Sequence, residues 1–477
     1  MYLPPVSAFP ALPDADTIAA IATAPGRGAV AVLRVSGPDA FAIVARCVPA
    51  SSTPRVATLA TVRDPRTGES LDRALVTRFP APRSYTGEDV VELATHGGLA
   101  VPAAVLAALV AAGARPAEPG EFTRRAVLRG RLDLAQAEAV GDLVDARTQA
   151  MRRAALVQLD GGLSRRVGAL REALLHVEAL LAYDIDFPEE DDGPVPRSRI
   201  AAAVAAARRG VEALLATAPA GAIARDGAVV VIAGPPNAGK SSLFNALAGE
   251  ARALVTDVPG TTRDALEVVV EPAPTDGART PWPLRLIDTA GLRATEDRVE
   301  RLGIELSERW VRRAHAVLAC GETVDDVVRT VVHVAALTEA PVLGVWTKSD
   351  ERTARSGESR PSSLIADRSA PAVLSVSAES GTGLHDLLTA TTDAIAARWS
   401  SPDPELPLVT RARQQHALEA ARDELAAFET AWEAARLPAP VAAVHLRAAV
   451  GALESLIGAV DVEDVLDRLF ASFCVGK

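Results

Sequence analysis

A glycine-rich stretch in the middle of the chain has the residue types and spacing of a phosphate-binding loop. GPPNAGKSS matches the pattern G-x-x-x-x-G-K-S, follows the β-branched run GAVVVIAG and precedes an apolar helical pattern. In that context, successive backbone amides and a helix N-terminus form a cradle for phosphate. Lys240 is placed to reach the terminal phosphates as a point charge, and the Ser241 hydroxyl is placed to bind Mg²⁺. The stretch therefore predicts a nucleoside triphosphate site.

Further motifs follow in chain order and indicate that the nucleotide is GTP. The strand pattern LRLIDTAG ends in D-x-x-G, so Asp288 can hold the magnesium shell and the Gly291 amide can meet the γ-phosphate. In TDVPGTTRD, Thr262 is placed as a switch threonine for Mg²⁺. After the strand-like VLGVW, Asp350 of TKSD can accept both hydrogens of the guanine edge, while the stem of Lys348 covers the ring.

A last motif, SVSAESGTG, offers backbone amides near guanine O6, and the motifs together predict a Ras-like GTPase domain. The residues expected at GTP are Asn237, Ala238, Gly239, Lys240, Ser241, Ser242, Thr256, Asp257, Val258, Pro259, Gly260, Thr261, Thr262, Asp288, Thr289, Ala290, Gly291, Thr347, Lys348, Asp350, Ser377, Ala378 and Glu379.

Two positions depart from the usual GTPase pattern. Thr347 replaces the asparagine of N-K-x-D, and a threonine keeps part of that hydrogen bonding, so guanine preference is expected while the affinity stays open. Leu292 stands where Ras-like enzymes place the glutamine that orients water. The chain is therefore either a slow switch that needs an external activator or an enzyme with another catalytic apparatus.

The elements that must position these residues change character along the chain. Residues 17 to about 125 alternate β-like stretches with Ala-rich helices, and the turns GRG and HGG are suited to a ligand approaching the backbone. After Gly161-Gly162 the period becomes that of one long helix, with an apolar face. That face consists of Leu163, Val167, Leu170, Leu174, Val177 and Leu181. Helical patterns return after SPDPELP, so a helical bundle interrupted by an inserted domain is expected, although two unrelated helical segments remain an alternative.

Composition excludes several classes of protein. The net charge is −11, so the chain is not a uniformly basic nucleic-acid binder. A local RNA patch could use Arg124, Arg125, Arg129 and Arg131, but a solvated helix face is the preferred interpretation. The three cysteines have no paired spacing, and the N-terminal stretch does not resemble a signal peptide. The longest apolar run, LAVPAAVLAALVAAGA, favours a helix covering a sheet over a membrane span, and the cytoplasm is the expected location.

Only three of the 50 Lys and Arg residues are lysines: Lys240, Lys348 and Lys477. Arginine has replaced lysine wherever a generic cation suffices, so these three positions are expected to need an ammonium group. The motifs assign two of them to GTP.

The whole chain resembles the bacterial tRNA modification GTPase family MnmE, also called TrmE. The resemblance rests on DTIAAIATAPGRGAVAVLRVSG, SYTGEDVVELATHGG, EPGEFTRRAVLRGRLDLAQAEAVGDLVDA and the C-terminal FCVGK, in addition to the GTPase motifs. It implies a multi-domain α/β protein. The implied parts are an N-terminal α/β folate-binding and dimerisation domain (1–128), two parts of a helical bundle domain (129–226 and 399–477) and an inserted Ras-like P-loop GTPase domain (227–398).

The resemblance also implies cofactors. The side chain of Asn237 and the carbonyls of Thr256, Val258 and Thr261 would bind K⁺ in place of an arginine finger, and Glu300 would position the attacking water. Glu300 and Lys240 are thus the expected catalytic residues. The ligands for 5,10-methylene- or 5-formyl-tetrahydrofolate would be Arg34, Glu92, Arg131 and Lys477.

Some of these residues have ordinary alternatives. Arg34 and Glu92 could be a buried ion pair between strands, the Arg131 position is commonly lysine in the family, and Lys477 could be a solvated tail cation. Cys474 could be a nucleophile, a redox-sensitive thiol or a packed side chain.

The function implied is K⁺-dependent GTP hydrolysis that serves tRNA modification. Family members act with the FAD-containing protein MnmG, in a heterotetramer-like complex, on the wobble uridine in the anticodon region of certain tRNAs. They form 5-aminomethyl or 5-carboxymethylaminomethyl groups and are homodimers. Two alternatives remain: a GTPase switch in ribosome assembly without RNA-modifying chemistry, and a folate-binding protein with a vestigial GTPase.

Overall fold

The computed structural model describes most of the chain, in two compact units. The described residues are 16–49, 53–186, 196–250, 266–272, 282–288, 308–348, 373–399, 406–433, 439–458, 469, 473, 475 and 476. The first unit contains residues 1–141, 159–208 and 420–477, and the second contains residues 142–158 and 209–419. These bounds differ from the four segments that the sequence predicts, and that four-part division stays a prediction.

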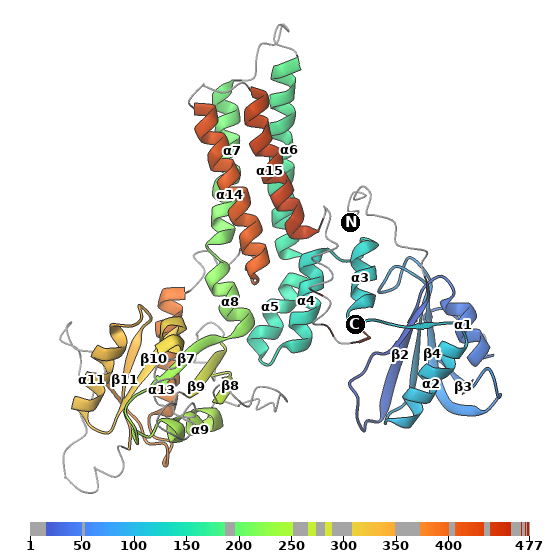
Figure 1. Cartoon of the computed structure of the whole chain (residues 1–477), viewed down its shortest axis with the longest axis horizontal. Coiled ribbons are helices and arrows are strands. Elements are labelled where there is room, and N and C mark those ends of the chain that lie inside the picture. The colour runs from blue at the N-terminus through green and yellow to red at the C-terminus, as the bar shows by residue number, and fades with distance from the viewer. Residues whose placement is uncertain are drawn as a thin grey trace, which may run out of the picture. The chain divides into compact units, whose positions relative to one another are not determined.

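The first unit holds a six-stranded sheet with the strand order β3-β4-β5-β2-β1-β6. Its strands are β1 (Ile18–Ile21), β2 (Val30–Ser36), β3 (Thr58–Arg63), β4 (Ser70–Phe79), β5 (Val90–His96) and β6 (Arg115–Pro116). Neighbouring strands are antiparallel, except that β6 pairs parallel with β1. The helices α1 (Ala40–Cys47) and α2 (Ala100–Ala111) cover one face (Figure 1).

Alternation along the strands decides which side chains meet those helices. Leu33 and Val35 of β2 are buried in the core, whereas Arg34, between them, lies on the opposite face of the sheet. The predicted helix over the apolar run is confirmed as α2, which buries Val105 and Leu109 against the sheet. Among the described helices, none combines the length and apolar character that a membrane-spanning segment needs.

The turns GRG and HGG contact each other. A Cβ on Gly97 would lie 2.2 Å from the carbonyl oxygen of Gly28, so the backbone of one turn packs on that of the other. Glycine is required at position 97 because a second chain segment packs against it, and a ligand at these turns stays a prediction.

The segment LDLAQAEA forms a capped helix start. After α3 (Glu121–Leu128), α4 (Leu134–Asp145) begins with a reciprocal pair: the Gln136 amide donates to Asp133 Oδ1 at 2.8 Å, and the Asp133 amide donates to Gln136 Oε1 at 3.0 Å. Gln136 Nε2 also donates to the Leu159 carbonyl at 2.8 Å. The motif thus fixes where α4 starts and ties this start to the last residue of the following helix, α5 (Gln149–Leu159).

Long helices make up the rest of the first unit: α6 (Gly162–Asp186), α15 (Ala439–Ile457) and the larger parts of α7 (Arg197–Leu215) and α14 (Ala412–Glu433). The predicted apolar face of α6 is confirmed, since all six of its residues are buried. Helix α6 packs along α15 (Figure 1), with an ion pair of 2.7 Å between Arg171 and Glu454. The guanidinium of Arg197 lies 3.9 Å from the ring centre of Trp432, which joins α7 to α14.

The second unit is built on a sheet with the strand order β12-β11-β10-β7-β9-β8. Its strands are β7 (Ala228–Ala233), β8 (Leu266–Val270), β9 (Leu284–Asp288), β10 (Ala316–Gly321), β11 (Val342–Trp346) and β12 (Val373–Ser375). All are parallel except β8, which is antiparallel to β9.

Helices cover both faces of this second sheet. Helices α9 (Lys240–Glu250) and α13 (Leu384–Trp399) share one core with it, and α11 (Val324–Ala335) packs on the other face. Helices α5 (Gln149–Leu159) and α8 (Ala218–Asp226) also belong to this unit, apart from the last residue of α5. Because the parallel strands end at one edge, the loops that follow β7, β9, β10, β11 and β12 emerge together there.

Candidate functional site

The loop between β7 and α9 is shaped by left-handed backbone at two residues. Asn237 has φ 66° and Gly239 has φ 69°, and the helix begins directly afterwards at Lys240. A Cβ on Gly234 would lie 2.5 Å from the Cys320 carbonyl oxygen, so only glycine allows the loop to leave the sheet there. A loop of this geometry turns its amides, and those of the first helical turn, toward an anion.

The Lys240 side chain folds back over this loop. The residue is 6% exposed, and its Nζ donates to the Pro235 carbonyl at 2.7 Å. Its charge is thus held beside the amides of the loop, where a phosphate group would need it.

A hydroxyl and a carboxylate meet next to the loop. The Ser241 hydroxyl donates to Asp288 Oδ2 at 2.7 Å, and Asp288, at the end of β9, is fully buried. Hydroxyl and carboxylate oxygens are the ligands that Mg²⁺ prefers. These two residues therefore fit a magnesium ion beside the loop.

Thr347 joins the glycine-rich loop to two strand ends. It follows β11 and is buried, and its Oγ1 lies 2.9 Å from the Ala238 carbonyl and 3.1 Å from the Gly321 carbonyl. The threonine that replaces the usual asparagine therefore retains a hydrogen bond to the loop.

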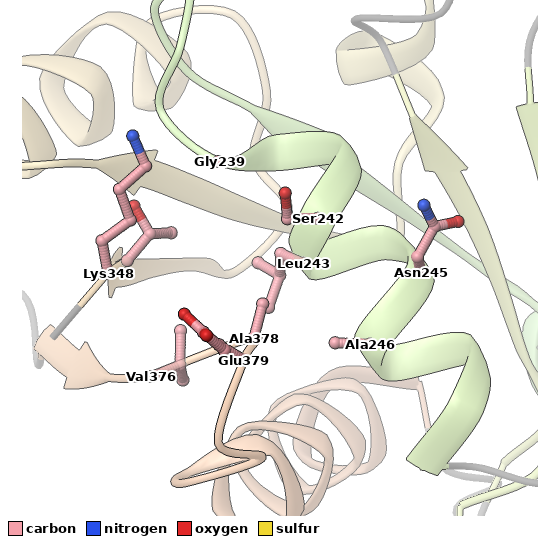
Figure 2. A pocket seen from close by; sticks show the side chains of 10 residues that line it. Gly239, Ser242, Leu243, Asn245, Ala246, Lys348, Val376, Ala378 and Glu379 are labelled. Atoms are coloured by element: carbon pink, nitrogen blue, oxygen red, sulfur yellow. The ribbon is translucent and has the colours of Figure 1, made fainter. Parts of the chain in front are cut away.

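A pocket of about 500 Å³ opens beside Thr347. Figure 2 shows Ser242, Asn245 and Ala246 of α9 on one side and Lys348 and Glu379 on the other. The full lining comprises Gly239, Ser242, Leu243, Asn245, Ala246, Thr347, Lys348, Val376, Ala378 and Glu379.

A tight turn after β12 presents Ala378 and Glu379 to this pocket. The Ser377 amide donates to the Thr382 carbonyl at 3.0 Å, and the Ser380 amide donates to Ser377 Oγ at 3.1 Å. The glycine-rich loop and the pocket are thus formed by residues that follow the ends of β7, β11 and β12.

Several predicted site residues lie outside the described part of the chain, and their roles stay predictions. They are Thr256, Asp257, Val258, Pro259, Gly260, Thr261, Thr262, Thr289, Ala290, Gly291, Glu300, Asp350, Cys474 and Lys477.

In the first unit, Arg34 and Glu92 stand directly opposite each other on β2 and β5. Both hydrogen bonds from Arg34, at 2.8 and 3.0 Å, fall on Glu92 Oε1. Among the described residues, no donor bonds to Glu92 Oε2. The guanidinium carbon lies 5.1 Å from the ring centre of Tyr85 and 5.6 Å from that of Phe122, so two aromatic rings hold Arg34 in place.

The two other predicted folate ligands are Arg131, which the structure describes, and Lys477, which lies outside the described residues. Arg131 is exposed, and its Cγ would be 3.2 Å from a Cβ on Gly87, in the loop that carries Tyr85. Lys477 is not described, but its neighbour Gly476 passes so close to Ile21 that a Cβ there would lie 2.6 Å from the Ile21 carbonyl oxygen. Ile21 is next to Ala20, which pairs with Arg34.

The arginines of TRRAVLRGRLD were expected on a solvated helix face, and for Arg125 this is wrong. Arg125 is 5% exposed, and its Nη2 bonds to Asp16 at 2.6 Å and to Glu121 at 2.9 Å. Arg125 and Arg129 also pair with the buried Glu88, at 3.3 and 2.7 Å. The burial of a cation is possible here because carboxylates from distant segments surround it.

Two carboxyl groups of this cluster, those of Asp16 and Glu121, have lowered pKa values. The hydrogen bond from Arg115 lowers the pKa of Asp16, burial works in the opposite direction, and Arg125 adds to the lowering. Burial would raise the pKa of Glu121, but hydrogen bonds from Arg115, the Glu118 amide and Arg125 outweigh it and lower the pKa.

The second unit is thus in the class of α/β proteins that form ligand sites at the carboxyl ends of parallel strands. The whole chain belongs to the MnmE (TrmE) family. A family model described as the MnmE helical domain matches residues 134–474, and one described as the GTP-binding protein TrmE N-terminus matches residues 17–131.

Full-length relatives agree with this assignment. The chain is 44% identical over 474 residues to the tRNA modification GTPase MnmE of Azoarcus sp. (strain BH72), covering 97% of this chain and 98% of the relative. It is also 44% identical to the protein of the same name from Methylorubrum populi, with 97% and 98% covered. The corresponding protein of Akkermansia muciniphila is 40% identical, with 97% and 99% covered.

The lowered pKa of Asp16 predicts acid sensitivity of the first unit. The stabilisation from the Asp16 carboxylate is fully present above the unfolded pKa of about 4 and is lost as pH falls through the lowered folded pKa. Since the side chain is half exposed, the stabilisation is at most about 1 kcal/mol. Asp16→Asn should therefore melt below wild type at pH 6, and the difference should shrink toward pH 3 in calorimetry. Asp39→Asn, at an exposed carboxyl, is the control, and a pH-independent difference for Asp16→Asn would contradict the assignment.

Proposed function

We propose that this chain is a GTPase that acts in the modification of tRNA. The observation that carries the proposal is the meeting of a phosphate-type loop, an acidic strand end and a pocket at one edge of a parallel sheet. Family membership supports it, since the relatives carry the name tRNA modification GTPase.

The proposed binding of the triphosphate rests on the loop and on Lys240. The loop amides bind phosphate oxygens, and Lys240 exchanges its bond to the Pro235 carbonyl for one to the terminal phosphates. Ser241 and Asp288, with Thr262 predicted beside them, hold Mg²⁺, which supplies positive charge against the phosphates when bound.

The proposed recognition of guanine uses the pocket. The stem of Lys348 lies along the base, the backbone of Ser377 to Glu379 faces guanine O6, and Asp350 accepts from the base edge. Through its hydrogen bond to the Ala238 carbonyl, Thr347 holds the part of the site that binds the base in a fixed position relative to the phosphate loop.

Hydrolysis is proposed to depend on K⁺ and on Glu300. Asn237 is exposed in a left-handed conformation, so its side-chain oxygen is available to a cation at the loop. Carbonyls of Thr256, Val258 and Thr261 complete the proposed set, and Glu300 positions the attacking water. Potassium, when bound, supplies charge where Ras-like enzymes use an arginine finger.

The first unit is proposed to bind a one-carbon tetrahydrofolate, 5,10-methylene- or 5-formyl-tetrahydrofolate, which supplies the carbon unit when bound. Glu92 Oε2 fits the adjacent N–H donors of the pterin, and Arg34 fixes the carboxylate in place. Arg131 and Lys477 complete the proposed ligands. A role for Cys474 as a nucleophile or redox-sensitive thiol stays a prediction.

The proposed assembly includes a second protein. A homodimer of this chain joins an FAD-containing MnmG-type protein in a heterotetramer-like complex in the cytoplasm, and the partner's flavin supplies the redox step. Together they form 5-aminomethyl or 5-carboxymethylaminomethyl groups on the wobble uridine, in the anticodon region of certain tRNAs. Closure of two GTPase domains would move the helical domains and gate this reaction.

The test of this function is nucleoside mass spectrometry of tRNA from cells that lack the protein. We expect C5-substituted wobble uridines to disappear and to return with wild type but not with Lys240→Ala, which removes a charge worth about 100-fold or more in hydrolysis. Arg209→Ala, at an exposed cation of α7, should restore them as wild type does. Unchanged nucleosides in the deletion strain would favour a ribosome-assembly switch instead.

Removal of the Thr347 hydroxyl should weaken guanine nucleotide binding. Thr347→Val leaves the Ala238 carbonyl without its donor, and we expect the Kd for GDP to rise about tenfold in titration calorimetry. Thr347→Ser keeps the hydroxyl and should remain near wild type. Equal affinity of the valine and serine variants would show that the hydrogen bond does not support the pocket.

Neutralisation of Glu92 should weaken the binding of folate without changing the binding of GTP. Glu92→Gln should weaken the binding of 5-formyl-tetrahydrofolate about tenfold or more, because the side chain loses its charge and its bond from Arg34 weakens. The KM for GTP should not change. Glu69→Gln, at an exposed carboxylate just before β4, serves as control, and wild-type folate affinity of Glu92→Gln would leave the strand ion pair as a purely structural feature.

A further inference from the structure

The segment Gly321-Glu322, which follows β10, bonds to three successive residues at the end of β11. The Glu322 carbonyl accepts from the Trp346 indole at 3.0 Å. The Gly321 carbonyl accepts from the Thr347 amide at 3.1 Å, and the Glu322 carboxylate forms an ion pair with the Lys348 ammonium. Gly321 and Glu322 thus hold residues 346–348, the stretch that leads into the pocket where the base is proposed to bind.

The backbone of this segment is fixed from its other side by α11. A Cβ on Gly321 would lie 2.5 Å from the Val327 amide nitrogen, so the helix packs directly on the segment. Thr323 caps α11 by accepting a hydrogen bond from the Asp326 amide at 3.1 Å. Glu322 therefore projects from a rigid base between a strand end and a helix cap.

Lys348 needs such support more than an ordinary lysine does. It adopts φ 55°, a left-handed conformation that non-glycine residues keep only when their surroundings hold them. Its side chain lines the pocket (Figure 2), and the side chains of Lys348 and Glu322 are 41% and 43% exposed. A pair so exposed contributes orientation more than stability.

We propose that Glu322 is a positioning residue for the nucleotide. It anchors the Lys348 ammonium at the rim, so that the flexible stem lies along the base side of the pocket before the nucleotide arrives. Affinity improves because less side-chain freedom is lost on binding. This inference rests on the proposed function as a GTPase and assigns Glu322 no contact with the reacting phosphates.

The experiment compares full-length variants in GDP titration calorimetry and in steady-state GTP hydrolysis. Glu322→Gln should raise the Kd for GDP and the KM for GTP about two- to fivefold and leave kcat unchanged. Glu322→Asp, which keeps the charge, should recover most of the loss. The difference from wild type should shrink as salt is raised from about 0.05 M to about 0.5 M, since exposed charges are screened.

Two controls separate positioning from general damage. Glu339→Gln breaks another exposed ion pair of this unit, that with Arg398 at 3.1 Å, and should leave the Kd at the wild-type value. In a Lys348→Met background, Glu322→Gln should have no further effect, because Glu322 acts through that lysine.

Three results would overturn the inference: wild-type affinity in Glu322→Gln, an equal loss in the Lys348→Met background, or a fall in kcat at unchanged KM. Failure of the wild-type chain to bind any guanine nucleotide would instead overturn the proposed function. The two failures are therefore distinguishable.

Discussion

The hydrogen bonding of the Thr347 hydroxyl is the constraint on which the second unit's site depends. The carbonyls of Ala238 and Gly321 lie within reach of this one group, so the loop after β7, the end of β10 and the end of β11 are held together. The three segments are far apart in sequence. In the proposed function, the loop holds phosphate and the β11 end holds the base, so this buried contact sets the distance between the two halves of the nucleotide site.

Local periodicity made the helices predictable, because an apolar stripe needs no knowledge of its partner. The face of α6 could be read from spacing alone, and the same holds for α2 as a cover for its sheet. Arg125 could not be placed in this way. A buried cation depends on Asp16 and Glu88, 109 and 37 residues away, and no spacing in TRRAVLRGRLD encodes them.

In the candidate site, too, features made by consecutive residues could be predicted, whereas contacts between distant segments could not. The glycine-rich loop was predictable, since its residues are consecutive and their chemistry is local. Glu322 was missed because it belongs to no motif and matters only through the register of β10 with β11, which pairs Gly321 with Trp346. The packing of Gly97 on Gly28 could not be predicted for a related reason, since the two turns are far apart in sequence.

The Arg34–Glu92 pair does not force a choice between an ion pair and a ligand site. A ligand that had to break the pair would leave two partly buried charges uncompensated, which is costly. Here both bonds use Glu92 Oε1, so a donor can reach Oε2 while the pair stays intact. Tyr85 and Phe122 keep the guanidinium in place meanwhile. In the proposed function, the pair therefore orients the carboxylate for a ligand, as Glu322 is proposed to orient Lys348 in the other unit.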